Sequence, residues 1–137
     1  MKTDNNNRRE HIFTGSIYED MAGYARAVIV GEQIFVSGTV GADFANGGQL
    51  AEGAEAQTEQ ALKTIADTLQ KAQSSLNDVV RVVAYVPDSN DVATVAAVLK
   101  RHFDRTRPAN TTVCSPLAVP NAKVELEVTA IRGSAAD

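Results

Sequence analysis

The clearest guide to the fold is the segment of residues 123–131, which reads KVELEVTAI. Every second residue from Val124 to Ala130 is apolar and the residues between them are polar, which is typical of a strand with one buried face. Residues 79–86 (VVRVVAYV) and 33–37 (QIFVS) are instead apolar on both faces apart from a few polar positions. Because strands of that kind need cover on both sides, we expect both faces of this sheet to be covered.

Two segments have the spacing of amphipathic helices, at about residues 54–73 and 89–106. In each of them apolar residues recur at steps of three and four, which places these residues on one face. The polar residues 88–90 offer capping oxygens to the second helix. Each helix has a single apolar stripe, so the pair is expected to cover one face of a sheet.

The remaining regular segments read as strands, at residues 26–30, 33–40, 79–86, 111–114 and 123–131, with a short one near 11–16. This order predicts an α+β fold in one domain of residues 1–137, with flexible ends at about 1–10 and 133–137. Because two helices cover only one face, we expect the other face to pack against further subunits. The alternative is a monomer whose loops cap that face.

Composition narrows the possible classes of function. The chain of 137 residues has a net charge of −4, which disfavours a broad basic surface for nucleic acid. No apolar run reaches the roughly 18 residues of a membrane span, and the first residues contain no hydrophobic signal segment. We therefore expect a cytoplasmic protein with no nucleic-acid partner and no membrane partner.

Motifs for metals and cofactors are missing from the sequence. There is no P-loop or GxGxxG motif, and two histidines with one cysteine offer no metal-ligand spacing. A Ser-His-Asp triad would need His11, near the start of the chain, or His102, which reads as a structural imidazole on a helix stripe. We therefore expect neither a metal nor an organic cofactor.

Polar residues on otherwise apolar strands are the remaining candidates for chemistry. Glu125 has apolar neighbours, and Glu127 lies on the same side of the strand. A carboxylate near a subunit boundary would be partly desolvated, which raises its pKa and suits proton exchange near neutral pH. The alternative is a pair of solvent-facing charges, or an ion pair with Lys123 or Arg81.

Two further groups of polar residues allow two interpretations each. Tyr24 and Arg26 are alternate residues on one side of a predicted strand, which fits either a binding surface or edge packing with a surface charge. Asn110 and Thr112 offer an amide and a hydroxyl, or they belong to a turn that leads into a strand.

Several stretches, in register, resemble the Rid family (reactive intermediate deaminase, also called YjgF). They are YARAVIVG at residues 24–31, IFVSG at 34–38, DVVRV at 78–82, YVPD at 85–88, RPAN at 107–110 and KVELEVTA at 123–130. The resemblance covers about residues 20–132. It implies a chorismate-mutase-like (YjgF-like) α+β fold: a six-stranded mixed sheet with two helices on one face. It also implies a homotrimer whose sheets form a central barrel.

The resemblance also implies an activity. Deaminase members of the family hydrolyse small enamines and imines, such as 2-aminoacrylate, to 2-oxo acids and ammonia in clefts between subunits. By the same resemblance, Glu125 falls on a glutamate that positions or activates the attacking water. Tyr24 and the pair Ser37 and Gly38 fall on positions that complete the substrate pocket, and Thr112 occupies a position that is often cysteine.

Asn110 departs from the family pattern, because it stands where the deaminases have an arginine that binds the substrate carboxylate. Asparagine has no charge and cannot reproduce the bidentate ion pair of a guanidinium. We expect Arg26 to supply a relocated cation in the same cleft, since strand alternation puts it on the side of Tyr24.

Three functions are compatible with these residues. The first is a cofactor-independent hydrolase of a small imine, enamine or related C–N substrate, with Glu125 managing the water. The second is a non-catalytic homotrimer that binds a small metabolite or a protein partner in the same cleft, which the missing arginine favours. The third is a ribonuclease, as an older family name suggests; the acidic composition and the lack of a general-base histidine disfavour it.

Overall fold

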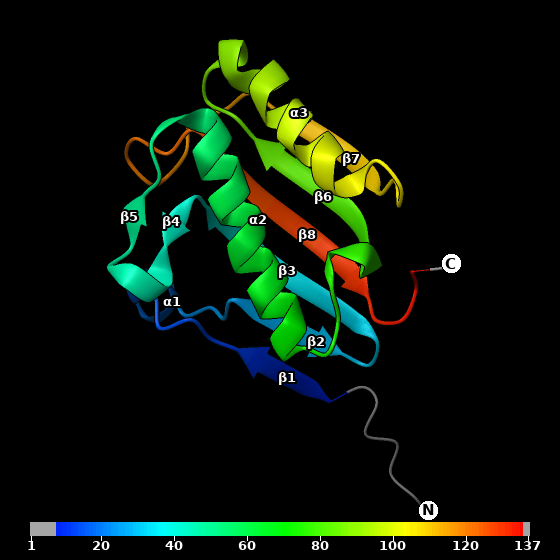
Figure 1. The fold of residues 1–137 in the computed structure, drawn as a ribbon. Helices are drawn as coiled ribbons and strands as arrows, with labels where there is room; N and C mark the ends of the chain where they lie inside the picture. Colours follow the sequence, from blue (N-terminus) through cyan, green and yellow to red (C-terminus); the bar gives the residue numbers. More distant parts are fainter. Residues whose placement is uncertain (1–7, 136–137) are drawn as a thin grey trace, which may run out of the picture.

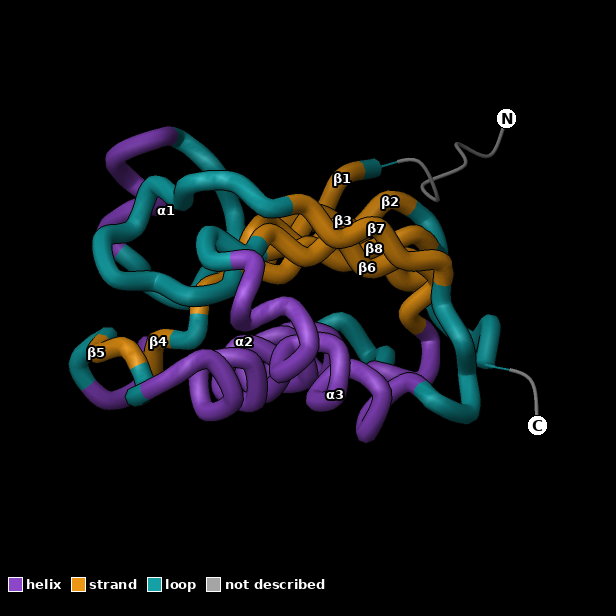
Figure 2. The backbone as a smooth tube through the Cα atoms, turned by 90° about the horizontal axis from the view of Figure 1, so that it is seen from above, coloured by secondary structure: helices purple, strands orange, loops and turns teal. Residues whose placement is uncertain are grey.

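The computed structural model of the protein describes residues 8–135. Figure 1 and Figure 2 show two layers, a sheet and two helices that cover one of its faces. The strands are β1 (Arg9–Ile12), β2 (Ala27–Val30), β3 (Gln33–Val40), β4 (Ala42–Asp43), β5 (Gln49–Leu50), β6 (Val79–Tyr85), β7 (Ala109–Val113) and β8 (Glu125–Ile131). The α-helices are α1 (Ile17–Ala22), α2 (Gly53–Lys71) and α3 (Val92–Phe103).

The main sheet has six strands in the order β1-β2-β3-β8-β6-β7. All neighbouring strands are antiparallel except β6 and β7, which are parallel and joined by α3. The predicted α+β fold with a six-stranded mixed sheet is therefore confirmed. The last long strand, β8, lies between β3 and β6, whereas β7 forms one edge of the sheet.

The hydrophobic core lies between the sheet and the helices α2 and α3. Its largest fully buried side chains come from both layers and include Ile34, Val82, Leu126, Val128, Leu62, Ile65, Leu69, Val95 and Val98. Leu126, Val128 and Ala130 of β8 face this core, as their alternation predicts, and Leu126 and Val128 pair with core residues of β6. Burial of this kind is the main favourable contribution to folding.

Within residues 8–135, no helix covers the opposite face of the sheet (Figure 2). Phe35 is 44% exposed on this face, and Ile131 is 37% exposed. An exposed apolar surface on a sheet is typical of a protein–protein interface. The expected oligomer remains a prediction, since the structure describes one chain.

Several element boundaries differ from the sequence predictions. The helix expected at residues 89–106 is shorter, because Asp88 caps a 3₁₀ turn over Ser89–Asp91 and α3 starts only at Val92. The strand expected at 111–114 starts two residues earlier, so Asn110 lies in β7 and the turn interpretation is wrong for this residue. The strand expected near 11–16 is β1, which ends at Ile12.

The predicted flexible ends fall partly on residues 1–7 and 136–137, which lie outside the described residues. Within the described part, Arg9 and Glu10 pair with β2, so they do not belong to a flexible arm. The segment after β8 is also held in place, because the backbone N–H of Ala135 donates to the carboxylate of Asp78.

A β-bulge interrupts the pairing of β3 with β8. Val36 pairs with Val128 and Thr39 pairs with Leu126, so three residue steps on β3 match two on β8. Thr39 consequently turns into the core, where its hydroxyl donates to the backbone carbonyl of Ser37 at 2.8 Å. The extra residue places Ser37 and Gly38 beside the start of β8.

Candidate active site

Glu125 lies at the border between the covered and the open parts of the sheet. It is the first residue of β8 and pairs with Val40 on one side and Tyr85 on the other. The side chain is half-buried and lines a cavity of about 310 Å³ together with Tyr24, Arg26 and other residues. The remaining lining residues are Ser16, Tyr18, Met21, Ala22, Gly38, Val40, Phe44, Ala118 and Val119.

Gly38 gives the Glu125 carboxylate the room that it occupies. A Cβ atom at position 38 would lie 2.7 Å from Oε2 of Glu125, well inside van der Waals contact. The bulge in β3 is what brings this backbone so close to the carboxylate. The sequence prediction that Gly38 and Glu125 belong to one site thus has a structural counterpart in a direct contact.

Arg26 is the cation of this cavity, and its side chain is 2% exposed. Its Nη2 atom donates to the carbonyl of Gly38 at 3.0 Å, and its guanidinium carbon lies 5.8 Å from the centre of the Tyr24 ring. Within residues 8–135 its Nε atom has no hydrogen-bond partner. The structure therefore brings Tyr24, Arg26, Gly38 and Glu125 together, as the sequence analysis expects of them.

Burial and two charged neighbours set the proton affinity of Glu125. Burial raises the pKa of Glu125 above its ordinary value, the positive charge of Arg26 lowers this pKa, and the negative charge of Glu127 raises it. The net effect is a raised pKa. Within residues 8–135, Glu125 forms no ion pair with Lys123 or Arg81, so that alternative is wrong.

Ser37 does not line the cavity of Glu125. Its hydroxyl donates to the backbone carbonyl of Ala25 at 2.7 Å, and its own N–H donates to the carbonyl of Arg26. Ser37 therefore holds the backbone segment that leads from Tyr24 to β2. Its role here is to position neighbouring residues, because its hydroxyl is engaged by the carbonyl of Ala25.

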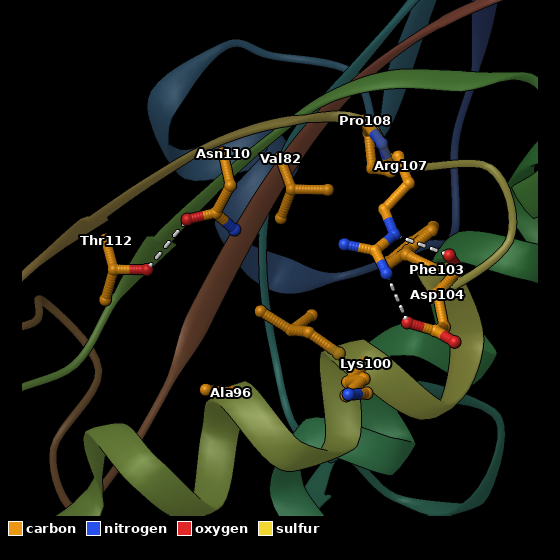
Figure 3. A pocket seen from close by; sticks show the side chains of 10 residues that line it. Val82, Ala96, Lys100, Phe103, Asp104, Arg107, Pro108, Asn110 and Thr112 are labelled. Atoms are coloured by element: carbon orange, nitrogen blue, oxygen red, sulfur yellow. Dashed lines mark hydrogen bonds and ion pairs between the residues drawn. The ribbon is translucent and has the colours of Figure 1, made fainter.

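Asn110 and Thr112 lie on the other face of the sheet. They pair with Val82 and Ala84, which both face the helices, whereas Glu125 follows the opposite alternation. Thr112 donates its hydroxyl proton to Oδ1 of Asn110 at 3.1 Å, and both line a pocket of about 270 Å³ between β7 and α3 (Figure 3). One chain therefore does not bring Asn110 and Thr112 together with Glu125.

The sequence analysis missed α1, which contributes Tyr18 and Met21 to the cavity. Ser16 begins this helix by accepting a hydrogen bond from the N–H of Tyr18, and Gly23 ends it in a left-handed conformation. The pattern Ser-x-x-Glu over residues 16–19 is a capping-box signal that would have predicted the start of this helix. Its six residues are too few to show helical periodicity.

Tyr85 is a second residue that the sequence analysis missed. Its hydroxyl donates to the Glu127 carboxylate at 3.0 Å, and this hydrogen bond raises the pKa of Tyr85. The hydrogen bond orients Glu127 beside Glu125 on the open face. A period-two pattern cannot predict such a cross-strand pair before the register is known.

The described residues contain neither a candidate metal site nor a membrane-spanning helix. Within residues 8–135, no group of three or more His, Cys, Asp or Glu residues is placed to hold a metal ion. No helix in the same range combines the length and the hydropathy needed to span a bilayer. His102 lies with its Nε2 atom 3.0 Å from the Glu59 carboxylate, far from the cavity of Glu125 in the fold.

Comparison with known proteins identifies the family. The family model described as endoribonuclease L-PSP matches residues 15–132. A RutC family protein from Pyrococcus abyssi is 32% identical over 124 residues, which are 90% of this chain and 98% of that protein. The 2-iminobutanoate/2-iminopropanoate deaminase of Mus musculus is 32% identical over 110 residues, 80% of this chain and 82% of that protein.

A solved structure agrees with these sequence relatives. The crystal structure of a YjgF/YER057c/UK114 family member from Mycobacterium tuberculosis superposes with a TM-score of 0.81 at 34% identity. The match covers 90% of this chain and 98% of that one. With its sheet order, its cavity at Glu125 and these relatives, the chain belongs to the YjgF/Rid family.

Proposed function

We propose that the protein is a deaminase that hydrolyses a small imine, enamine or related C–N substrate in clefts between the subunits of a homotrimer. The observation that carries the proposal is the half-buried Glu125, whose raised pKa and position in a cavity suit proton transfer near neutral pH. The names of the deaminase relatives support the same reaction class. The proposed setting is the cytoplasm, with a small-molecule substrate.

In the proposed reaction Glu125 acts as the general base. A water molecule attacks the carbon of the C=N group while the ionised carboxylate accepts one of its protons. Glu125 then returns this proton to the nitrogen, which gives a neutral carbinolamine. The carboxylate next accepts the hydroxyl proton and passes it to the nitrogen, so that the C–N bond breaks, ammonia leaves and a carbonyl group remains. General-base catalysis of this kind contributes about 10²–10⁴-fold to a rate.

The other residues of the cavity have supporting roles in this proposal. The Tyr24 ring closes the cavity beside Arg26, and the close approach of Gly38 fixes the Glu125 carboxylate. Arg26 supplies a positive charge beside Glu125, which lowers the pKa of this carboxyl group; that it also replaces the missing family arginine stays a prediction. Ser37 holds the Tyr24–Arg26 segment through the carbonyl of Ala25.

A cleft between two copies would unite the two halves of the site. In one chain the Glu125 cavity and the pocket of Asn110 and Thr112 lie on opposite faces of the sheet. The proposed trimer lets the β7 edge of one copy face the Glu125 cavity of the next. Asn110 and Thr112 would then polarise the substrate through an amide and a hydroxyl.

The test is ammonia release from imines generated in situ from several amino acids, with Glu125→Gln beside the unmodified protein. We expect activity to fall by about 10²-fold or more in the variant, because glutamine accepts no proton from water. Glu127→Gln is the matched control, since it removes a neighbouring carboxylate that the mechanism does not use. Equal activity of the Glu125→Gln variant would refute the role of this carboxylate.

A second candidate function is a non-catalytic homotrimer that binds a small metabolite or a protein partner in the same cleft. The observation that favours it is Asn110, which lacks the charge of the family's carboxylate-binding arginine. This alternative predicts no ammonia release from acidic, neutral or amide-type substrates. It also predicts that a small ligand still binds to the Glu125→Gln variant.

A further inference from the structure

The pocket between α3 and β7 combines an apolar floor with a polar rim. Val82, Leu99 and Phe103 are buried and form the floor. Figure 3 shows Asn110 and Thr112 on the β7 side and Lys100 on the α3 side. A pocket of about 270 Å³ holds a ligand of a few heavy atoms that has one apolar and one polar end.

The charges around this pocket leave one cation uncompensated. Arg107 donates to the backbone carbonyl of Asp104 at 2.6 Å and to its carboxylate at 2.9 Å, so these two charges neutralise each other. Lys100 forms no ion pair with any carboxylate of residues 8–135. The rim therefore carries a net positive charge at Lys100.

The backbone fixes where Arg107 can reach. Its φ of 54° lies in the left-handed region, and its N–H donates to the carbonyl of Phe103 in the manner of a helix C-terminal cap. The guanidinium is thereby held at the end of α3 beside Asp104 (Figure 3). Lys100 has no such restraint, and its four-carbon stem lets the ammonium turn toward the pocket.

The Glu125 cavity differs in its charge balance. Arg26 lies beside the Glu125 carboxylate, and Arg26 acts on the proton affinity of Glu125. An anionic substrate group placed there would meet a positive and a negative charge together, and the two largely cancel at a distance. Lys100, in the pocket between α3 and β7, forms no ion pair with a carboxylate of residues 8–135 and is therefore the cation that can attract an anion.

We propose that Lys100 binds the negatively charged group of the substrate, assisted by the Asn110 amide and the Thr112 hydroxyl. The apolar part of the substrate then rests on Val82, Leu99 and Phe103. This inference rests on the proposed function, because it assigns the substrate's charge to one copy and its reacting carbon to Glu125 of the next. It makes Lys100 a specificity-determining residue for small monoanionic substrates.

The experiment compares an acid and a neutral substrate of equal size, 2-iminobutanoate generated in situ and its amide. Lys100→Ala should raise KM for the acid about 10-fold with little change in kcat, since one exposed charge-assisted contact is worth about that factor. KM for the amide should stay the same, and Lys100→Arg should restore the preference for the acid. Lys63→Ala is the control, because Lys63 is exposed on α2 and pairs with Asp67.

A binding measurement keeps this inference testable apart from catalysis. Titration of the ¹⁵N-labelled protein with 2-oxobutanoate, the product of the acid substrate, should shift the side-chain amide signal of Asn110. The shift should weaken in Lys100→Ala and at high salt, where charges are screened. If ammonia release depends on Glu125 but neither KM nor the titration depends on Lys100, the inference is wrong and the proposed function stands. If ammonia is never released, the proposed function fails, and the titration alone decides the role of Lys100.

Discussion

The two faces of the main sheet are built from the same strands, but they differ in what their residues can do. The face toward α2 and α3 is buried and apolar over the central strands, with Ile34 and Leu126 completely enclosed, and it becomes polar at the β7 edge. The open face mixes apolar side chains with the carboxylates of Glu125 and Glu127. In β8, for example, Leu126 contributes to the hydrophobic core, whereas the adjacent Glu125 lines the cavity on the open face.

A perturbed proton affinity arises in this fold where a carboxylate is only partly buried. A carboxylate in the core would stay neutral, and a carboxylate in solvent would keep its ordinary pKa. Glu125 is intermediate between these two cases, because its side chain at the start of β8 is half-buried and its pKa is raised. The border between the faces is therefore the place where a strand residue can become a proton carrier.

The largest expected effect comes from substituting neighbouring residues on the two faces. Ile34→Ala should lower the free energy of unfolding by about 2–5 kcal/mol, because it opens a cavity in the core. Phe35→Ala should instead abolish the proposed trimer while each copy keeps its native circular dichroism. Chemical denaturation measures the first effect, and sedimentation velocity measures the second. A Phe35→Ala protein with an unchanged sedimenting mass would mean that the open face is not the interface.

A smaller effect is expected from two glycines, Gly38 inside the β3 bulge and Gly41 directly after β3. Gly38→Ala should lower kcat about 10-fold or more with little change in Tm, because its Cβ would displace the flexible Glu125 side chain. Gly41→Ala is the contrasting variant, since its Cβ would lie 2.2 Å from the backbone carbonyl of Gln57 and should destabilise the fold. Thermal unfolding and ammonia release separate the two outcomes. Unchanged kcat in Gly38→Ala would show that the carboxylate position is not critical.

The smallest expected effect is a shift of the acid limb of the pH–rate profile. Activity should fall as pH drops through the raised pKa of Glu125, since the base must be ionised. Glu127→Gln removes a negative neighbour and should move this limb to lower pH. Arg26→Gln removes a positive neighbour and should move it to higher pH. Shifts of equal sign in both variants would contradict this assignment of the titrating group.

Most of the fold could be predicted because its signals are periodic. The alternation in β8 and the stripes of α2 and α3 follow directly from which residues face a common core. The short helix α1 and the strands β4 and β5 are too brief for periodicity, so contacts with neighbouring elements determine them. The end of α3 was also placed too late, because Arg107 adopts a left-handed conformation that no apolar pattern reveals.

The candidate site could be predicted only in part. Glu125 and Arg26 are charged residues in segments predicted as apolar strands, and Gly38 is part of a family motif. The structure brings these three residues together in one cavity. Regular alternation would have turned Val40 toward the helices, but the bulge turns Thr39 inward instead. The opposite placement of Asn110 depends on the parallel register of β6 and β7, which a single strand's pattern does not contain.

The bulge in β3 has a consequence for how this architecture can evolve. Removing one of its two central residues would leave Val36 opposite Val128 and Thr39 opposite Leu126, in an unbroken ladder. The sheet therefore carries a residue that its own pairing does not require. In the bulge, Gly38 provides the carbonyl that accepts a hydrogen bond from Arg26 and the open space beside Glu125. Deletion or insertion of a single codon could therefore remove or restore this part of the cavity while the pairing of the sheet is kept.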